Sequence, residues 1–327
     1  MTDTQNEVFK TPVNKIRLFE HGAPGSQNFK LTRKYYTEDM PDGRVKHIVQ
    51  NITDPDIVPY IPDGIGNSTD RQRIPAVLII PGGAFRRLVY NFEGEDVAKW
   101  LNSMGIAAFV LECRLPSDEH DNAEDVPLID AMRAMRVIRG RAQEFGIDEA
   151  KIGVMGFSAG GFMAALLSTA YESDVYADYK YKDEYDKLSA RPDFAVCSYP
   201  VISIDDCIEA GKRYMSEEQV LERISDSKAK ILHKYNPDKL VRPDMPPVFI
   251  CETDDDRTTL SENSVGFYMA ARKAGVSAEL HIFRTGGHGY GCGDDFAQTG
   301  EWKVLFTKWI KSCLLYTSPS PRDRTRS

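Results

Sequence analysis

The stretch that decides the fold is Gly156-Phe157-Ser158-Ala159-Gly160, followed by Gly161. It lies between residues 151–155, an apolar segment that predicts a β-strand, and residues 159–171, a small-residue segment that predicts a helix. A serine in such a tight turn is held in a strained conformation, with its hydroxyl above the sheet and beside a helix N-terminus that favours negative charge. Gly, Ala and Ser are common residues, so the pentapeptide alone also fits an ordinary glycine-rich turn. Other segments have to decide between the two interpretations.

The segments around this turn alternate between short apolar runs and longer helical patterns. The predicted strands are residues 76–80, 106–112, 151–155, 194–199, 248–251 and 278–283. The predicted helices are residues 94–104, 126–145, 159–171, 260–274 and 296–313. Continuous apolar strands that alternate with helices predict a mostly parallel sheet covered on both faces. We therefore expect an α/β fold with a central sheet of about eight strands.

The two ends of the chain differ from this pattern. Residues 28–36 and 45–53 predict an antiparallel hairpin, with turn residues at 40–43, and residues 54–73 predict a loop. We find no internal repeat and no clear linker, so residues 1–314 are expected to form a single domain. Residues 315–327 are rich in Ser, Pro and Arg and have no apolar periodicity, so we expect a disordered, non-native tail.

Composition excludes several classes of partner. The 327 residues carry a net charge of -8, which disfavours nucleic acid and anionic membranes. No apolar run approaches a membrane span and no leader is evident, so we expect a cytoplasmic protein. The 6 scattered cysteines indicate reduced thiols. No metal-binding motif is present, and we expect neither a metal nor a cofactor.

A serine nucleophile needs a base, and the sequence offers one clear candidate. Gly286-Gly287-His288-Gly289-Tyr290 follows the last predicted strand, and among the 6 histidines only His288 lies in a glycine-flanked loop there. The alternative interpretation is a solvated loop histidine. A carboxylate must then orient the imidazole, and Asp254, Asp255 and Asp256 follow the strand at 248–251. Alternate residues project differently, so only one should reach the histidine. We choose Asp255, although the spacing leaves the other two open.

Backbone amides must stabilise the negative oxygen that forms during acyl transfer. Ala159, directly after the serine, is expected to supply one amide. Pro81-Gly82-Gly83-Ala84 follows an earlier strand, so Gly83 or Ala84 should supply the other, unless the segment is a simple glycine turn. Arg86 could orient a polar substrate or form a surface salt bridge. The other candidates for substrate contacts are Tyr199 and Tyr290.

Five tyrosines lie in a charged stretch after the serine helix, at positions 171, 176, 179, 181 and 185. They would serve as a partial lid that stacks on a sugar, or as a solvated connection half-packed on the domain. We favour the packed connection.

These motifs resemble the acetyl xylan esterase-like branch of the α/β hydrolases, which is related to dienelactone hydrolase and prolyl oligopeptidase. The likeness covers most of residues 15–313 and rests on Pro81-Gly82-Gly83, Glu93-Gly94, Arg114-Leu115-Pro116, Gly156 to Gly161 and Tyr199-Pro200-Val201-Ile202-Ser203. It implies the α/β-hydrolase fold and ester hydrolysis by a Ser-His-Asp triad without a cofactor, often on acetylated carbohydrate. Ala84 stands where a third glycine is common, and the CETDDDRTT segment also departs from the family pattern.

The expected function is therefore a serine esterase that hydrolyses short-chain esters, above all acetyl esters on xylo-oligosaccharides or related carbohydrate, through an acyl-enzyme. The expected partner is a small-molecule or oligosaccharide ester, with no nucleic acid and no membrane, and homo-oligomer formation is left open. One alternative is a peptidase or aminoacyl hydrolase of the prolyl-oligopeptidase type. Such enzymes usually carry a large N-terminal propeller, which about 70 residues cannot form. A catalytically silent hydrolase-fold binding protein is the third interpretation.

Overall fold

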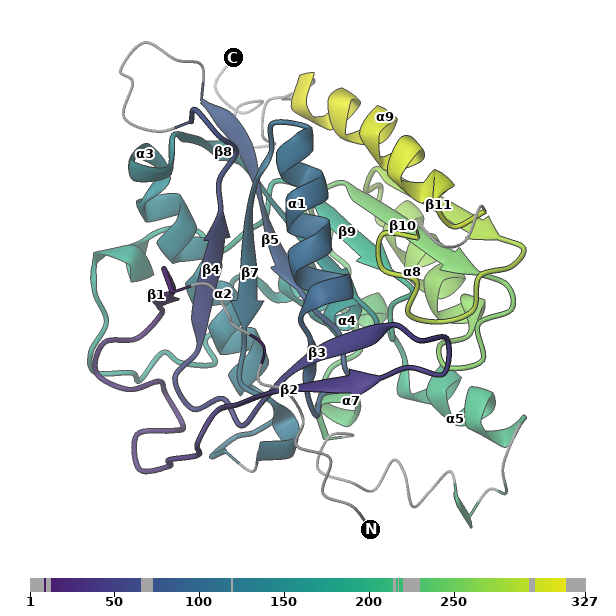
Figure 1. Ribbon diagram of the computed structural model, residues 1–327, viewed down its shortest axis with the longest axis horizontal. Coiled ribbons are helices and arrows are strands. Elements are labelled where there is room, and N and C mark those ends of the chain that lie inside the picture. The colour runs from purple at the N-terminus through teal and green to yellow at the C-terminus, as the bar shows by residue number, and fades with distance from the viewer. Residues whose placement is uncertain are drawn as a thin grey trace.

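The computed structural model describes residue 9 and residues 13–65, 73–118, 120–213, 216, 218–219, 230–293 and 298–315. Within them, one sheet has eight strands in the order β1-β4-β7-β5-β8-β9-β10-β11 (Figure 1). These strands are β1 (Ile16–Arg17), β4 (Asp56–Tyr60), β5 (Ile74–Ile80), β7 (Ala107–Glu112), β8 (Ile147–Phe157), β9 (Ala195–Ser198), β10 (Val248–Thr253) and β11 (Ala278–Phe283). β1 and β7 flank β4 in antiparallel pairing, whereas the strands from β7 to β11 are parallel. The predicted sheet is confirmed.

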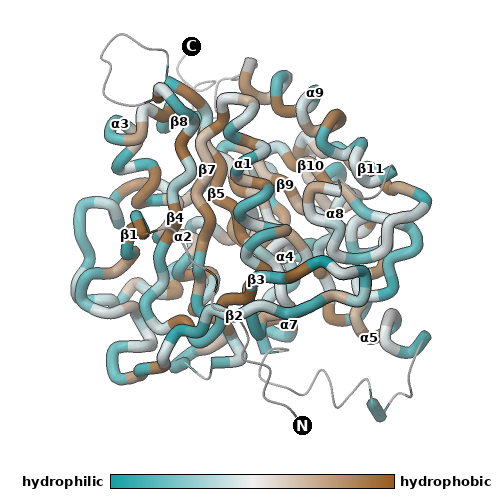
Figure 2. The backbone as a smooth tube through the Cα atoms, in the orientation of Figure 1, coloured by the Kyte–Doolittle hydropathy of each residue, from teal (hydrophilic) through white to brown (hydrophobic). Residues whose placement is uncertain are grey.

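The core lies along the parallel strands. Every residue of β7, β9 and β10 is buried, and Figure 2 shows hydrophobic residues gathered on the central strands with hydrophilic residues on the outer loops. Strands that are covered on both faces read as continuous apolar runs, which is why these segments could be predicted from sequence.

Helices cover the two faces of the sheet. They are α1 (Asp96–Ser103), α2 (Val126–Gly140), α3 (Ala142–Phe145), α4 (Ala159–Ala170), α5 (Ile204–Lys212), α7 (Lys230–Lys234), α8 (Ser261–Lys273) and α9 (Glu301–Leu315). On one face α1 lies beside α9, where the Trp100 ring packs 5.0 Å from that of Trp302, and α2 and α4 cover the other face (Figure 1). No helix among the described residues is long and apolar enough to cross a membrane. The expected cytoplasmic location stays a prediction.

The predicted hairpin forms, but in a separate sheet. This sheet consists of β2 (Lys34–Asp39), β3 (Val45–Gln50) and β6 (Leu88–Val89). Its turn closes with hydrogen bonds from the Gly43 amide to the Met40 carbonyl and from the Met40 amide to the Arg44 carbonyl, at 2.9 and 2.8 Å. Residues 85–87 connect the glycine-rich segment at 81–84 to β6, and the Val89 amide donates to the Gly82 carbonyl at 2.9 Å, so this sheet supports that segment.

Several boundaries differ from the sequence prediction. Residues 54–73 were expected to form a loop, yet β4 lies within them and buries Ile57 and Val58 against β7. Pro59 can stand in this strand because, over the described residues, β1 pairs only with residues 56–57. The predicted helix at 126–145 breaks after Gly140, which lies so close to Tyr185 that a Cβ there would be 2.3 Å from the ring. α9 runs from 301 to 315 rather than from 296 to 313, and the rest of the predicted tail lies outside the described residues.

Candidate active site

Ser158 occupies the turn between β8 and α4. Its backbone has φ 54° and ψ -119°, a left-handed conformation that a side chain rarely adopts. A Cβ at Gly156 would lie 1.9 Å from the carbonyl oxygen of Gly160, and a Cβ at Gly160 would lie 2.0 Å from that of Ile80. The glycines are therefore required by the close approach of backbone to backbone, and together they hold the serine in its strained turn.

His288 reaches this serine from a loop 130 residues further along the chain. Its Nε2 lies 2.9 Å from Ser158 Oγ. Three glycines around it, at positions 286, 287 and 289, have positive φ, so the loop can turn sharply after β11. The structure thus brings together the two residues that the sequence pairs as nucleophile and base.

The carboxylate on the other side of the imidazole is Asp256, and the prediction that Asp255 occupies this position is wrong. His288 Nδ1 lies 2.6 Å from Asp256 Oδ2. Asp255 is exposed and instead accepts hydrogen bonds from the Gly286 and Gly287 amides, at 2.9 and 2.8 Å. The chain turns after β10, as the contact of the Asp256 amide with the Thr253 carbonyl shows. This turn exposes Asp254 and Asp255 and directs only the third aspartate inward.

Asp256 is held as a carboxylate by several donors. The amides of Thr258 and Thr259 donate to its Oδ1 at 2.7 and 2.9 Å, and the Thr259 hydroxyl donates to Oδ2 at 3.0 Å. Burial alone would raise the pKa of Asp256, but the hydrogen bond and charge of His288, together with these amides, bring that pKa below its ordinary value. The carboxylate can therefore orient the imidazole and stabilise its cationic form.

Glu252 is a second buried carboxyl on this side of the site, and the sequence analysis did not single it out. Burial, and then the charge of Asp256, raise the pKa of Glu252 well above its usual value. The Thr253 amide and the Ser264 hydroxyl donate to its oxygens at 3.0 and 3.2 Å. Burial and the nearby charge of Asp256 thus both disfavour ionisation of Glu252.

The segment that carries the predicted amide donors Gly83 and Ala84 lies directly beside the serine. Gly82 is so close that a Cβ there would be 2.9 Å from Ser158 Cβ. Gly83, Ala84 and Phe85 all have positive φ, at 137°, 57° and 59°. Within the described part of the chain, the amides of Gly83, Ala84 and Ala159 make no hydrogen bond to protein. A strained loop whose amides lack protein acceptors is typical of a site that binds an oxyanion.

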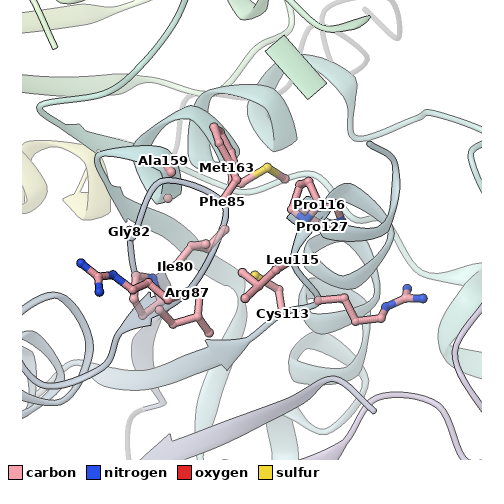
Figure 3. A pocket seen from close by; sticks show the side chains of 14 residues that line it. Ile80, Gly82, Phe85, Arg87, Cys113, Leu115, Pro116, Pro127, Ala159 and Met163 are labelled. Carbon is pink, nitrogen blue, oxygen red and sulfur yellow. The ribbon is translucent and has the colours of Figure 1, made fainter. Parts of the chain in front are cut away.

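A small cavity of about 20 Å³ lies between this loop and the start of α4 (Figure 3). Its lining is mostly apolar and includes side chains of Phe85, Leu115, Pro116 and Met163, while Gly82 and Ala159 form its border with the serine turn. The side chain of Arg87 points away from it (Figure 3). A volume of this size holds one group of about the dimensions of a water molecule.

Comparison with known proteins identifies the family. The profile of the BD-FAE family matches residues 65–270, which is more than half of the chain. The chain belongs to the BD-FAE family.

Two curated relatives share this part of the sequence. The chain is 30% identical over 250 residues to an acetylxylan esterase of Xylanibacter ruminicola, a match covering 76% of this chain and 46% of that protein. It is 29% identical over 269 residues to endo-1,4-beta-xylanase B of Butyrivibrio fibrisolvens, covering 80% and 40%. The chain thus spans less than half the length of either relative.

Solved structures show the same fold. An acetyl ester-xyloside bifunctional hydrolase from Caldicellulosiruptor lactoaceticus is 35% identical, with a TM-score of 0.66 over 91% of this chain and 95% of that one. A carboxylesterase from Lactobacillus plantarum WCFS1 is 21% identical, with a TM-score of 0.64 over 88% of this chain and 100% of that one, and it supports the fold alone. The expected α/β-hydrolase fold is confirmed.

The prediction that Tyr199 and Tyr290 of this BD-FAE protein contact the substrate is wrong. Tyr199 is 0% exposed and Tyr290 is 4% exposed, so neither ring can face a ligand. Tyr199 packs edge-on against the His288 ring at 5.0 Å and against Tyr290 at 4.5 Å. Tyr199 therefore supports the His288 ring, and Tyr290 packs against Tyr199. Arg86 is exposed beside the loop, and its contact with substrate stays a prediction.

The tyrosines after α4 form a packed connection, as expected. Tyr171, Tyr176 and Tyr179 are buried, and the Tyr179 hydroxyl donates to the Gly22 carbonyl at 2.9 Å. Tyr176 donates to Asp186 at 2.9 Å. These three side chains hold the connection on the domain, and Tyr185 is half-buried, whereas Tyr181 is 41% exposed. The connection is therefore mostly packed, as predicted. Among the described residues, no group of three or more His, Cys, Asp or Glu side chains could hold a metal ion.

Glu93 is the functional candidate that reasoning from single residues missed. It appeared in the sequence only as part of the Glu-Gly pair shared with the family, and nothing in its local pattern predicts burial. The structure places it beneath the site with 4% exposure, in contact with Gly82 and Tyr199.

Proposed function

We propose that this chain is a serine carboxylesterase that removes acetyl groups from xylan-derived carbohydrate. The observation that carries the proposal is the hydrogen-bonded chain from Ser158 Oγ through His288 to Asp256, at 2.9 and 2.6 Å, beside amides that lack protein acceptors. The names of two relatives, an acetylxylan esterase and an acetyl ester-xyloside hydrolase, support acetylated xylan fragments as the substrate class.

The geometry supports a two-step reaction through an acyl-enzyme. Nε2 of neutral His288 accepts the Ser158 proton as Oγ attacks the ester carbonyl, and Asp256 stabilises the resulting imidazolium. The amides of Ala159 and of Gly83 or Ala84 donate to the carbonyl oxygen as it gains charge, each contributing about 3 kcal/mol to the barrier reduction. His288 then protonates the departing sugar hydroxyl, and afterwards it activates the water that releases acetate.

The small cavity supports a short acyl group. It borders Gly82 and Ala159, so it lies next to the bond that would join the acyl carbon to Ser158. Its volume of about 20 Å³ suits a methyl group, and its apolar lining favours one. We propose that the acetyl methyl binds there and that longer chains are disfavoured.

The test is a release assay. We expect acetate release from acetylated xylo-oligosaccharides and from p-nitrophenyl acetate, and labelling of the wild-type protein by a fluorophosphonate probe. Ser158→Ala should abolish both. Near-normal turnover by that variant would refute the serine mechanism, and cleavage of an aminoacyl amide without cleavage of p-nitrophenyl acetate would favour a peptidase instead.

A further inference from the structure

Glu93 lies beneath the proposed reaction centre, yet no step of the proposed reaction uses it. It belongs to a turn of π-helix, η1 (Asn91–Glu95), just before α1. The Gly82 amide donates to its Oε2 at 2.8 Å, and the Tyr199 hydroxyl donates to its Oε1 at 2.9 Å. A Cβ at Gly82 would lie 2.7 Å from that same Oε2 and 2.9 Å from Ser158 Cβ. The carboxyl group is therefore packed directly against residues 81–84, the proposed oxyanion loop, close to the serine.

The hydrogen bonds around Glu93 use both of its carboxyl oxygens as acceptors. The Gly291 amide donates to the Tyr199 hydroxyl oxygen at 3.0 Å, which leaves the tyrosine proton for Glu93. The Gly82 amide donates to the other carboxyl oxygen. This arrangement favours the ionised carboxylate, which accepts hydrogen bonds without donating one.

Charges and donors near Glu93 offset part of the cost of burying it. Burial keeps the pKa of Glu93 above its usual value, although the positive charge of His288 and the hydrogen bonds from Tyr199 and Gly82 oppose that rise. The titratable groups that act on Glu93 include His288, Tyr199 and Lys46. Because attraction between charges is mutual, the carboxylate in turn favours the cationic form of His288. Asp256, on the far side of the imidazole, acts in the same direction.

Glu93 also connects segments that are distant in sequence. Gly82 follows β5, Tyr199 follows β9, and Gly291 lies in the loop after His288. A Cβ at Gly291 would lie 2.6 Å from the carbonyl oxygen of Phe92, so this loop also packs against the π-helical turn itself. Glu93 thus contacts the oxyanion loop directly, and it reaches the histidine loop (residues 286–291) through Tyr199.

We propose that Glu93 is a positioning residue for the esterase reaction. It holds the oxyanion loop at Gly82 and, through Tyr199, the histidine loop at Gly291, and its negative charge stabilises the imidazolium formed as Ser158 attacks. The inference rests on the proposed function, and it adds a second carboxylate to the one that contacts His288 directly.

The experiment compares Glu93→Gln and Tyr199→Phe with Glu95→Gln. Glu95 lies in the same π-helical turn but pairs with Lys99 at the surface, at 2.8 Å, so its variant is the matched control. For p-nitrophenyl acetate we expect Glu93→Gln to lower kcat by about 10- to 100-fold with little change in KM, since small displacements of reacting groups have effects of this size. The acid limb of its kcat/KM profile should move to lower pH, because the imidazolium loses a nearby negative charge. Tyr199→Phe should also lower kcat, because it removes the link from Glu93 to Gly291. Glu95→Gln should match the wild type in kcat and in pH profile.

Three results would overturn the inference. One is a folded Glu93→Gln protein with wild-type kcat and pH profile. Another is a fall in kcat without movement of the acid limb, which a purely structural role would give. If Glu93→Gln does not fold, Tyr199→Phe decides, since it removes only the hydroxyl, and wild-type behaviour there also overturns the inference. A wild-type protein that neither hydrolyses esters nor reacts with fluorophosphonate would instead refute the proposed function.

Discussion

At the scale of the residue, the three consecutive aspartates show how much one position changes. Asp256 is buried and contacts the imidazole, whereas Asp255 faces solvent and binds two amides of the histidine loop. The sequence places all three aspartates in the same loop, and only the direction of the turn after β10 separates them. Identical side chains one position apart therefore have different roles.

This difference predicts opposite outcomes for two conservative variants. Asp256→Asn removes the charge that orients and stabilises the imidazole, so kcat for p-nitrophenyl acetate should fall by about 10⁴-fold. Asp255→Asn keeps an oxygen that can accept from the two glycine amides, so its kcat should stay within a few-fold of the wild type. Steady-state kinetics on both purified proteins checks the order, and a larger loss for Asp255→Asn would contradict the assignment.

At the scale of the element, the proposed oxyanion loop depends on backbone conformations that are unfavourable for any residue with a side chain. Gly83 has φ 137°, and a Cβ there would lie 2.1 Å from the carbonyl oxygen of Arg87, which is backbone and cannot move aside. The loop is also bounded by β5 on one side and by β6 of the hairpin sheet on the other. Its geometry is therefore a property of two sheets together.

We expect Gly83→Ala to displace the loop and to lower kcat by about 100-fold, the size of effect seen when one oxyanion donor is lost. The matched control is Gly266→Ala in α8, where a Cβ would meet nothing within 4 Å. That variant should keep full activity and gain up to about 1 kcal/mol in the free energy of unfolding, because alanine is the better helix former. Kinetics and urea unfolding measure both effects, and an active Gly83→Ala protein would refute the role of the loop.

The cavity proposed to bind the acyl group belongs to the same scale, since it lies between a loop and a helix. Met163→Ala should enlarge it and raise the ratio of kcat/KM for p-nitrophenyl butyrate to that for the acetate by about tenfold, the effect of one or two added methylenes in an apolar pocket. Measuring both esters on the variant and the wild type gives this ratio. An unchanged ratio would mean that the acyl group binds elsewhere.

At the scale of the whole molecule, buried charges connect the N-terminal region to the sheet. Arg33 Nη1 lies 2.6 Å from both Asp56 Oδ2 and Glu112 Oε2, and Lys15 Nζ lies 2.5 Å from Glu112 Oε1. Glu112, at the end of β7, is 0% exposed. Burial, and then the charge of Glu112, raise the pKa of Asp56 to about 6. At neutral pH the stability of this cluster therefore depends on the positive charges of Arg33 and Lys15.

We expect Arg33→Met to lower the free energy of unfolding at neutral pH by about 3 kcal/mol, because it removes the shared partner of Asp56 and Glu112 and leaves only Lys15 to offset two buried carboxylates. Since the folded protein binds the Asp56 proton more tightly than the unfolded chain does, protonation below about pH 6 favours the folded state, and the loss should shrink at about pH 5. Arg17→Met is the control, as its contact with Asp54 is long and exposed, at 3.9 Å. Urea unfolding at the two pH values tests this, and an equal loss at both would contradict the cluster's role.

The sequence by itself determined the parallel sheet, the serine turn and the histidine loop, because continuous apolar strands and flanking glycines are local patterns. Only the tertiary structure decided which aspartate faces the imidazole, that residues 56–60 form a strand, that Tyr199 and Tyr290 are buried, and that Glu93 is buried against Gly82 and Tyr199. Each of these depends on which segments meet across the sheet. The pairing of distant segments and the burial of polar groups are set by long-range contacts, so they cannot be predicted from local sequence patterns.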